Sequence, residues 1–441
     1  MTLPIDADTI RSATPQEHAA WHSEIHTRLA ESPVQPNTID VNMTGHRAAH
    51  QAIAGVVGGG HPTSIAELDP LHLDWHRWIH FFLDTPTTPL VISSGGTYRG
   101  LNVGTADTGD PAIDIRTDAQ VILEAPMIAH HHMGIESTTF NAVNVEVRNG
   151  MWWGRDPAVD DYGHAIYSYQ FARWVVEHCR FYNSNCINLA GNNVEASRIW
   201  LNNNDFLDMG RWHMPGLDGS IHFDKVLCGD CRMRWNRTVN HFGFSESEDV
   251  FGMYQSNGFP GAAFDIAYNL VDGNYPPSGD GAGFTGCCYD LGDSFGTYQH
   301  QHHNYAVRYA NVAMSSPAGS YLSHDHSKAV GSGLTDTGAR CNSTFGGGAS
   351  LWDNPAYPDT PHHLTMTDCV LAHRRWTGTA WERADWWFPG TVDETNVNNT
   401  TISGLGLTVD ADWLDAENDL LAEYEAMRAT AGQTFGPQRM I

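Results

Sequence analysis

Short runs of alternating apolar and polar residues fill the chain from about Pro89 to Leu407, separated by Gly, Asn and Asp. This alternation is typical of short β-strands that bury one face. A motif of polar residue, variable residue and β-former recurs through the stretch. Its first members begin at Asn144, His178, Asn204, Asn236, Asn269 and Asn304, at intervals of 34, 26, 32, 33 and 35 residues. Two later members begin at Thr367 and Asn399.

Intervals of this size fit one coil of a β-solenoid plus a loop. An Asn at each bend tolerates left-handed backbone and can bond to the Asn of the next coil. The sequence therefore predicts a mainly β protein, a right-handed parallel β-helix over residues 88–408. A β-propeller is the competing architecture, but its blades take roughly 40–50 residues each. The shorter intervals and the absence of a blade motif argue against it.

Helical patterns flank the predicted solenoid. In residues 1–87, Thr14-Pro15-Gln16-Glu17 is a capping box, and Leu71, Trp75, Trp78 and Phe82 follow coiled-coil-like spacing. This region is expected to form an attachment region or neck between symmetry-related chains, or to pack on the first coil. Residues 409–441 are expected to contain a helix that covers the end of the solenoid or joins a neighbouring chain, since an open strand edge invites aggregation.

Charge narrows the range of partners. The chain has 24 Lys and Arg against 51 Asp and Glu, a net charge of −27, and its two lysines are Lys225 and Lys328. Such acidity is similar to that of halophilic proteins, although a GC-rich genome also favours Arg over Lys. Without a basic stripe to neutralise phosphates, nucleic-acid binding is not expected. No run approaches the roughly 20 apolar residues of a membrane span, so membrane insertion is not expected.

Two further features bear on location and redox state. The first residues, MTLPIDADTIRSATPQEH, have no basic n-region and no apolar h-region, so we expect no secretory signal. The eight cysteines are scattered along the predicted solenoid, and Cys179 and Cys369 fall at the repeat position. We expect buried free thiols, since Cys228-Gly-Asp-Cys231 has no second CxxC to complete a zinc site.

The layout resembles the tail fibres and tailspikes of tailed viruses. A helical N-terminal segment precedes the run SSGGTYRGL at 93–101 and then a β-helix, and HRAAHQAI at 46–53 is similar to linker helices of tail proteins. The resemblance implies a virion tail subunit, assembled in the host cytoplasm. It implies a homotrimer that contacts other tail or baseplate proteins and binds host surface glycan or glycoprotein. A virus of a halophilic archaeon fits the charge.

Two other functions remain open. One is a glycan-degrading hydrolase or lyase on the same scaffold, although the signature residues of pectate lyases, polygalacturonases and alginate epimerases are not found. The other is a purely structural virion decoration. The residues chosen as catalytic candidates, because they lie near aromatics on successive coils, are Asp224, Glu248 and Asp249. The aromatic candidates for stacking on sugar rings are Trp152, Trp153, Trp212, Trp235 and Tyr254.

Histidine is abundant, with 25 residues. In an extended strand, residues i and i+2 share a face. His300 and His302 are therefore the candidates for a metal site, and His324 and His326 have the same spacing. Two histidines do not complete a coordination shell, so neutral surface histidine is the simpler interpretation.

Overall fold

The structure is a computed structural model, and it describes part of the chain. The described residues are 87–438, without 106–108, 140–141, 155–162, 210–218, 243–244, 246, 248, 276–286, 291–297, 311, 318–320, 337, 342–346, 353–361, 384–385, 388–391, 398–399 and 402–404. Residues Thr87–Gln438 make one compact unit. The predicted N-terminal helices fall on residues 1–86 and lie outside the described residues.

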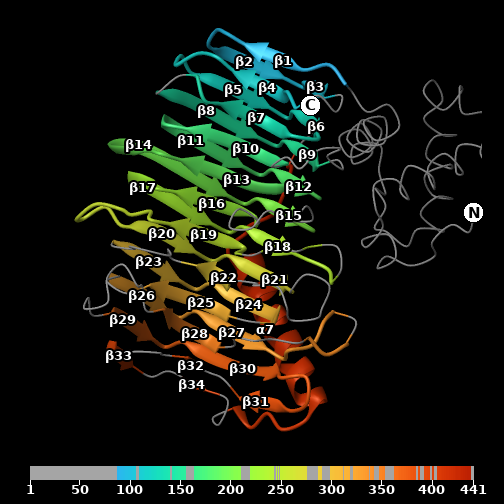
Figure 1. Cartoon of the computed structure of the whole chain (residues 1–441), viewed down its shortest axis with the longest axis vertical. Helices are drawn as coiled ribbons and strands as arrows, with labels where there is room; N and C mark the ends of the chain where they lie inside the picture. Colours follow the sequence, from blue (N-terminus) through green and yellow to red (C-terminus); the bar gives the residue numbers. More distant parts are fainter. Residues whose placement is uncertain are drawn as a thin grey trace, which may run out of the picture. The chain divides into compact units, whose positions relative to one another are not determined.

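Three long sheets run the length of this unit, and the chain visits them in turn (Figure 1). Sheet A contains β1 (Leu90–Ile92), β4 (Pro111–Ile115), β7 (Met133–Ser137), β10 (His164–Tyr169), β13 (Asn185–Ala190), β16 (Ile221–Asp224), β19 (Phe251–Tyr254), β22 (Cys287–Asp290), β25 (Val312–Pro317), β28 (Gly347–Trp352) and β32 (Trp386–Trp387).

Sheet B contains β2 (Gly96–Arg99), β5 (Val121–Glu124), β8 (Val143–Arg148), β11 (Phe171–Glu177), β14 (Asn193–Asn202), β17 (Leu227–Arg234), β20 (Phe264–Ala267), β23 (Gln299–His302), β26 (Tyr321–Asp325), β29 (His362–Thr367) and β33 (Val392–Val397). Sheet C contains β3 (Asn102–Gly104), β6 (Met127–His130), β9 (Met151–Gly154), β12 (Arg180–Tyr182), β15 (Asp205–Leu207), β18 (Arg237–Val239), β21 (Leu270–Asn274), β24 (Tyr305–Tyr309), β27 (Lys328–Gly331), β30 (Val370–Trp376), β31 (Trp381–Arg383) and β34 (Thr400–Thr401).

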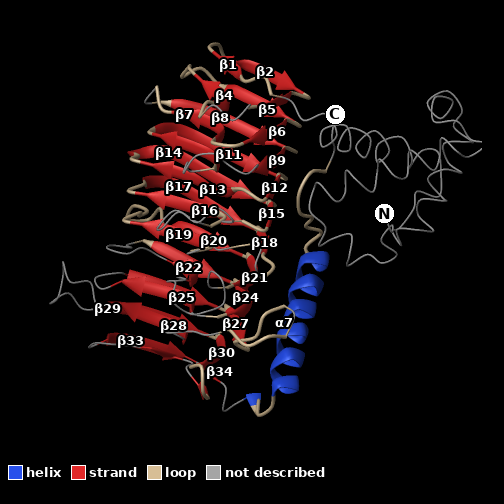
Figure 2. Cartoon of the chain, turned by 45° about the vertical axis from the view of Figure 1, so that its right-hand side comes forward, coloured by secondary structure: helices blue, strands red, loops and turns tan. Residues whose placement is uncertain are grey.

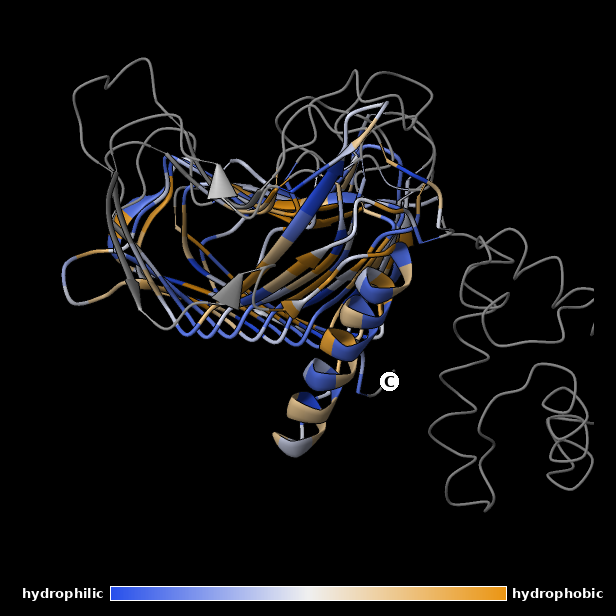
Figure 3. Cartoon of the chain, turned by 90° about the horizontal axis from the view of Figure 1, so that it is seen from below, coloured by the Kyte–Doolittle hydropathy of each residue, from blue (hydrophilic) through white to orange (hydrophobic). Residues whose placement is uncertain are grey.

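As far as the pair of β27 and β30, each strand pairs in parallel with the strand three places later in the chain. β31 pairs antiparallel with β30, so β28, β29 and β30 pair in parallel with β32, β33 and β34, four places later. The prediction of a parallel β-helix is confirmed. Alternate side chains of the three sheets point into one shared interior, which Figure 3 views along the stack. Rings also stack from coil to coil inside it: Trp152 on Phe181 at 4.5 Å, and Phe181 on Phe206 at 4.8 Å between centroids.

An asparagine ladder fixes the bend between sheets B and C. Asn204, Asn236, Asn269 and Asn304 are buried, and each side-chain amide donates to the Oδ1 of the next at 3.0 Å. The predicted stacking of these asparagines is thus found, at intervals of 32, 33 and 35 residues. Asn144, by contrast, lies within β8, and so it does not belong to the ladder.

The residue before each ladder position has left-handed backbone. Its φ is 58° at Asn203, 56° at Trp235, 59° at Tyr268 and 53° at His303. The same left-handed position recurs at His326 and Asp368 on later coils, and at Ala125, Asn149 and His178 on earlier coils. We call this series of residues the left-handed column. His178 therefore belongs to this column, and Cys179 holds the ladder position of its coil, where its backbone N–H donates to Asn204 Oδ1 at 3.0 Å.

The C-terminal helix, α7 (Asp410–Thr430), lies lengthwise along the side of the solenoid (Figure 2). It packs on sheet C at β24 and β27, and not across the end of the stack, which was one of its two expected positions. The reason is that sheet C exposes an apolar strip there. The buried side chains of the interface are Leu270, Tyr305, Val307, Val330, Ala372, Leu407, Trp413, Leu420 and Tyr424. The other expected position, contact with a neighbouring chain, stays a prediction.

All eight cysteines are buried and free, as predicted. Burial raises the pKa of the Cys228, Cys231, Cys287 and Cys288 thiols, among others, which keeps them protonated and unreactive. The CxxC pair is part of this apolar interior, because Cys228 and Cys231 both belong to the core of the solenoid. These thiols fill space between coils.

Candidate functional site

The outward face of sheet B carries a row of charged and aromatic side chains. In β14, Ile199 and Leu201 point inward and are fully buried, so Arg198 and Trp200 point outward. In the next coil, Asp230 lies beside Arg198, and Arg232 lies beside Trp200. We call these four residues the Trp200 platform.

Contacts within the Trp200 platform hold its aromatic ring in place. Asp230 accepts hydrogen bonds from Arg198 Nε at 2.9 Å, Arg232 Nε at 3.0 Å and Trp200 Nε1 at 3.1 Å. Both guanidinium groups also lie over the indole, 4.5 Å and 4.8 Å from its centroid. The two arginines are 44% and 47% exposed, so N–H groups other than Nε face solvent on an ordered aromatic surface.

Arginines continue this row over four adjacent strands. They are Arg148 in β8, Arg173 in β11, Arg198 in β14, and Arg232 and Arg234 in β17. Carboxylates lie between them: Glu146 contacts Arg148 at 2.6 Å and Arg173 at 2.7 Å. This face therefore gathers five arginines of a chain with net charge −27, each paired with a carboxylate of the same face. Such an array suits an extended anionic ligand.

Asp265 links the arginine row to the histidines of β23. Its carboxylate accepts from Arg234 and from His302 Nε2, the latter at 3.1 Å. Burial of Asp265 opposes ionisation, but the hydrogen bonds from His302 and Arg234 outweigh it and hold the pKa of this carboxyl below its ordinary value. Asp265 is therefore ionised and is not suited to act as a general acid.

Two of the aromatic residues predicted to bind glycan are in the core. Trp152 is 2% exposed and Trp153 is 6% exposed, so neither ring can stack on a sugar in this fold. Trp235 is half-buried and stacks on Tyr268 at 4.6 Å, which occupies one face of its indole. Tyr254 is half-buried in β19, with Lys225 Nζ 5.1 Å from its ring centroid. Trp212 lies outside the described residues.

Of the predicted catalytic residues, the structure describes Asp224 and Asp249, and these two lie apart. Glu248 lies outside the described residues. Asp249 accepts a hydrogen bond from the Cys287 backbone N–H at 2.7 Å, and Asp224 pairs with Lys225 at 3.1 Å. Asp224 lies beside Tyr254 at the end of β19, whereas Asp249 precedes Phe251, the first residue of that strand. The steps from Phe251 to Tyr254 alone span about 10 Å. Glycosidase carboxyls stand about 5–9.5 Å apart, so these two cannot act as such a pair.

The histidines partly follow the expected spacing. His300 and His302 lie on one face of β23, with ring centroids 4.8 Å apart. His324 and His326 do not share a face: His324 is buried, whereas the His326 side chain is 49% exposed because it lies at the left-handed bend. Burial lowers the pKa of His324 to about 4, so this imidazole is neutral at pH 7.

Four rings form a continuous stack along the left-handed column. Centroids are 4.6 Å apart for Trp235 and Tyr268, 4.9 Å for Tyr268 and His303, and 4.9 Å for His303 and His326. Bulky side chains are unfavourable in left-handed backbone, by roughly 1–2 kcal/mol each. Strain of this kind persists where the surrounding structure fixes it and is frequent at functional sites.

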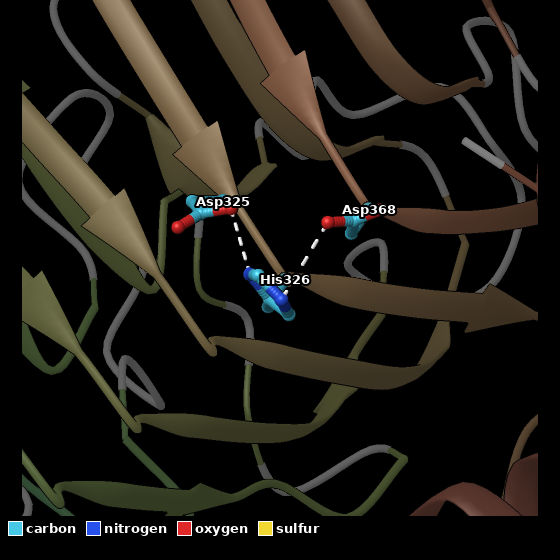
Figure 4. Close-up of side chains that lie close together, drawn as sticks. All are labelled: Asp325, His326 and Asp368. Carbon is cyan, nitrogen blue, oxygen red and sulfur yellow. Dashed lines mark hydrogen bonds and ion pairs between the residues drawn. The ribbon is translucent and has the colours of Figure 1, made fainter. Parts of the chain in front are cut away.

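The stack ends at a cluster of Asp325, His326 and Asp368, shown in Figure 4. The imidazole lies between two carboxylates: His326 Nδ1 is 2.7 Å from Asp325 Oδ1, and Nε2 is 3.6 Å from Asp368 Oδ2. One ligand atom from each residue lies within 4.8 Å of the others. This arrangement offers oxygen and nitrogen donors to a cation.

The sequence indicated His326, paired with His324, as a possible metal ligand, but it did not point to Trp200 or to Asp368. The alternation in Arg198-Ile199-Trp200-Leu201 was a sufficient signal for an outward Trp, since both neighbours of Trp200 are aliphatic. No comparable signal existed for Asp368, which is 42 residues from His326 and meets it through coil stacking. Comparisons of the chain with protein-family models, curated proteins and solved structures gave no match. Among the described residues, no helix has the length and apolar character needed to cross a membrane.

Proposed function

We propose that this chain is a subunit of a viral tail fibre or tailspike that binds acidic glycan on the host surface. The Trp200 platform carries this proposal, because it combines an ordered indole with two guanidinium groups on an exposed sheet. The indole holds both guanidinium groups in place, and their free N–H groups can pair with carboxylate or sulfate of a glycan. The arginine row extends the same surface over neighbouring coils, which matches the repeating charge of a polysaccharide.

Glycan binding is tested by replacing Trp200. Affinity of the full chain for acidic oligosaccharides, measured by titration calorimetry, is expected to fall at least about tenfold in Trp200→Ala, since the ring that positions both guanidinium groups is removed. Arg232→Ala is expected to lose affinity for acidic more than for neutral oligosaccharides.

The matched control is Arg116→Ala. Arg116 is also exposed and paired with an aspartate, Asp114 at 2.6 Å, but it follows a strand of sheet A. It should leave glycan affinity unchanged. Equal affinities in the Trp200→Ala variant and the parent, across acidic glycans, would contradict the proposal.

The tail-subunit part of the proposal has separate tests. Soluble protein should block virus adsorption if the chain is the attachment protein, whereas a structural decoration would not. We propose a homotrimer, and light scattering at high salt that gave a monomer mass would exclude it. Release of reducing sugar or unsaturated product from host envelope glycan would instead establish the glycan-degrading enzyme.

A further inference from the structure

We propose that Asp325, His326 and Asp368 form a binding site for a divalent transition-metal ion such as Zn²⁺. The proposal is independent of glycan binding and of the virus assignment. It starts from the arrangement in Figure 4, where one imidazole nitrogen faces each carboxylate. Asp325 Oδ1 accepts from the Nδ1–H of His326, which leaves the lone pair of Nε2 directed toward the side of Asp368.

The separation of Nε2 and Asp368 Oδ2 suits two ligands of one ion. Zn²⁺ binds imidazole nitrogen and carboxylate oxygen at about 2.0–2.2 Å, so tetrahedral ligands lie about 3.4 Å apart. The observed separation is 3.6 Å. A hydrogen bond from the second ring nitrogen to a carboxylate is the usual support of a metal-binding histidine. Asp325 is in position to give that support through Oδ1.

The backbone holds these donors in place. His326 and Asp368 occupy the left-handed column on consecutive coils, with φ of 50° and 52°. The His326 N–H donates to the Thr367 carbonyl at 2.9 Å, which ties the two coils together beside the site. The His303 ring stacks on the His326 ring at 4.9 Å with an interplanar angle of 1°, which fixes the plane of the imidazole. The donors are therefore ordered before an ion arrives.

The donor set and its exposure decide the class of ion. One imidazole nitrogen with one carboxylate oxygen favours Zn²⁺, Mn²⁺, Fe²⁺ or Co²⁺, whereas Ca²⁺ and Mg²⁺ prefer oxygen alone. The three side chains are 38%, 49% and 40% exposed, so an ion enters without movement of the chain. The coordination positions that these residues leave are filled by water or by an external ligand.

Titration calorimetry of the metal-stripped full chain with ZnCl₂ tests the site. The tightest binding step is expected to weaken about 10–100-fold in His326→Asn and in Asp368→Asn. Asn tolerates left-handed backbone, so both changes remove a donor while keeping the bend. His178→Asn is the matched control, because His178 has φ of 55° at the same column position on a distant coil. Its Zn²⁺ affinity should equal that of the parent.

Two results would overturn the proposal. The first is unchanged Zn²⁺ affinity in His326→Asn and Asp368→Asn, with thermal unfolding showing that both variants fold. The second is loss of the tightest step in the double variant His300→Asn/His302→Asn while His326→Asn retains it, which would assign the ion to β23. Binding by Mg²⁺ as tight as by Zn²⁺ would contradict the role of the imidazole.

Discussion

At the scale of the residue, Asn236 shows how one side chain joins three coils. Its Nδ2 donates to the Leu201 carbonyl at 2.8 Å and to Asn269 Oδ1 at 3.0 Å. Its Oδ1 accepts from the backbone N–H and the side-chain amide of Asn204, at 3.2 and 3.0 Å. The side chain is fully buried, so each of these bonds is made away from water.

Replacing Asn236 by Ala therefore leaves several buried polar groups without their partner. Each unsatisfied group costs about 1–3 kcal/mol, so the free energy of unfolding should fall by about 3–5 kcal/mol. Denaturant titration followed by circular dichroism measures the effect. Asn193→Ala, on the exposed start of β14, should stay within about 0.5 kcal/mol of the parent. Equal unfolding midpoints for Asn236→Ala and Asn193→Ala would show that the asparagine ladder does not contribute to stability.

At the scale of the element, α7 is held by packing and by a buried acid. Trp413, Leu420 and Tyr424 are buried against sheet C. Glu417 lies on the same side, where it accepts the Ser332 backbone N–H at 2.8 Å. Burial is the main cause that raises the pKa of Glu417 to about 7, from an ordinary value near 4.5.

This raised pKa makes the docking of α7 depend on pH. Folded Glu417 holds its proton up to about pH 7, whereas in the unfolded chain it loses the proton near pH 4.5. Its contribution to stability is therefore complete below pH 4.5 and is lost as pH rises through 7. One pKa unit corresponds to about 1.4 kcal/mol, so the shift from 4.5 to about 7 corresponds to about 3 kcal/mol of unfolding free energy. This stabilisation is absent above pH 7.

Hydrogen exchange of the α7 amides should thus be slower at pH 5 than at pH 8, after correction for intrinsic exchange. Glu417→Gln keeps a neutral side chain at every pH and should remove most of this difference. Glu423→Gln is a suitable control, since Glu423 is exposed on the same helix and pairs with Lys328. The same pH dependence in parent and Glu417→Gln would refute the role of this carboxyl.

At the scale of the whole molecule, the balance of 51 acids against 24 bases sets the response to salt. Like charges repel within the folded chain, and the Debye length falls from about 30 Å at 0.01 M to about 10 Å at 0.1 M. We expect the melting temperature to rise by several degrees between 0.02 and 0.5 M NaCl. Choline chloride at equal ionic strength should raise the melting temperature in the same way. A melting temperature that falls with either salt would contradict the role of charge repulsion.

The sequence by itself determined the architecture. Alternating residues, with Asn204, Asn236, Asn269 and Asn304 at nearly constant intervals, specify a solenoid because strand pleat and turn chemistry are local. The helix at 410–430 was likewise visible as an apolar stripe. Its place along sheet C was not, because the apolar strip beneath it is assembled from strands far apart in the chain.

The tertiary structure alone decided which side chains of different coils meet. It also placed both Trp152 and Trp153 in the core, although strand alternation predicts that one of two neighbouring residues faces outward. His326 meets Asp368 because their coils stack at the same bend. Loops of unequal length separate the coils, so sequence distance does not give the register. The site depends on that register, whereas the fold depends on the repeat.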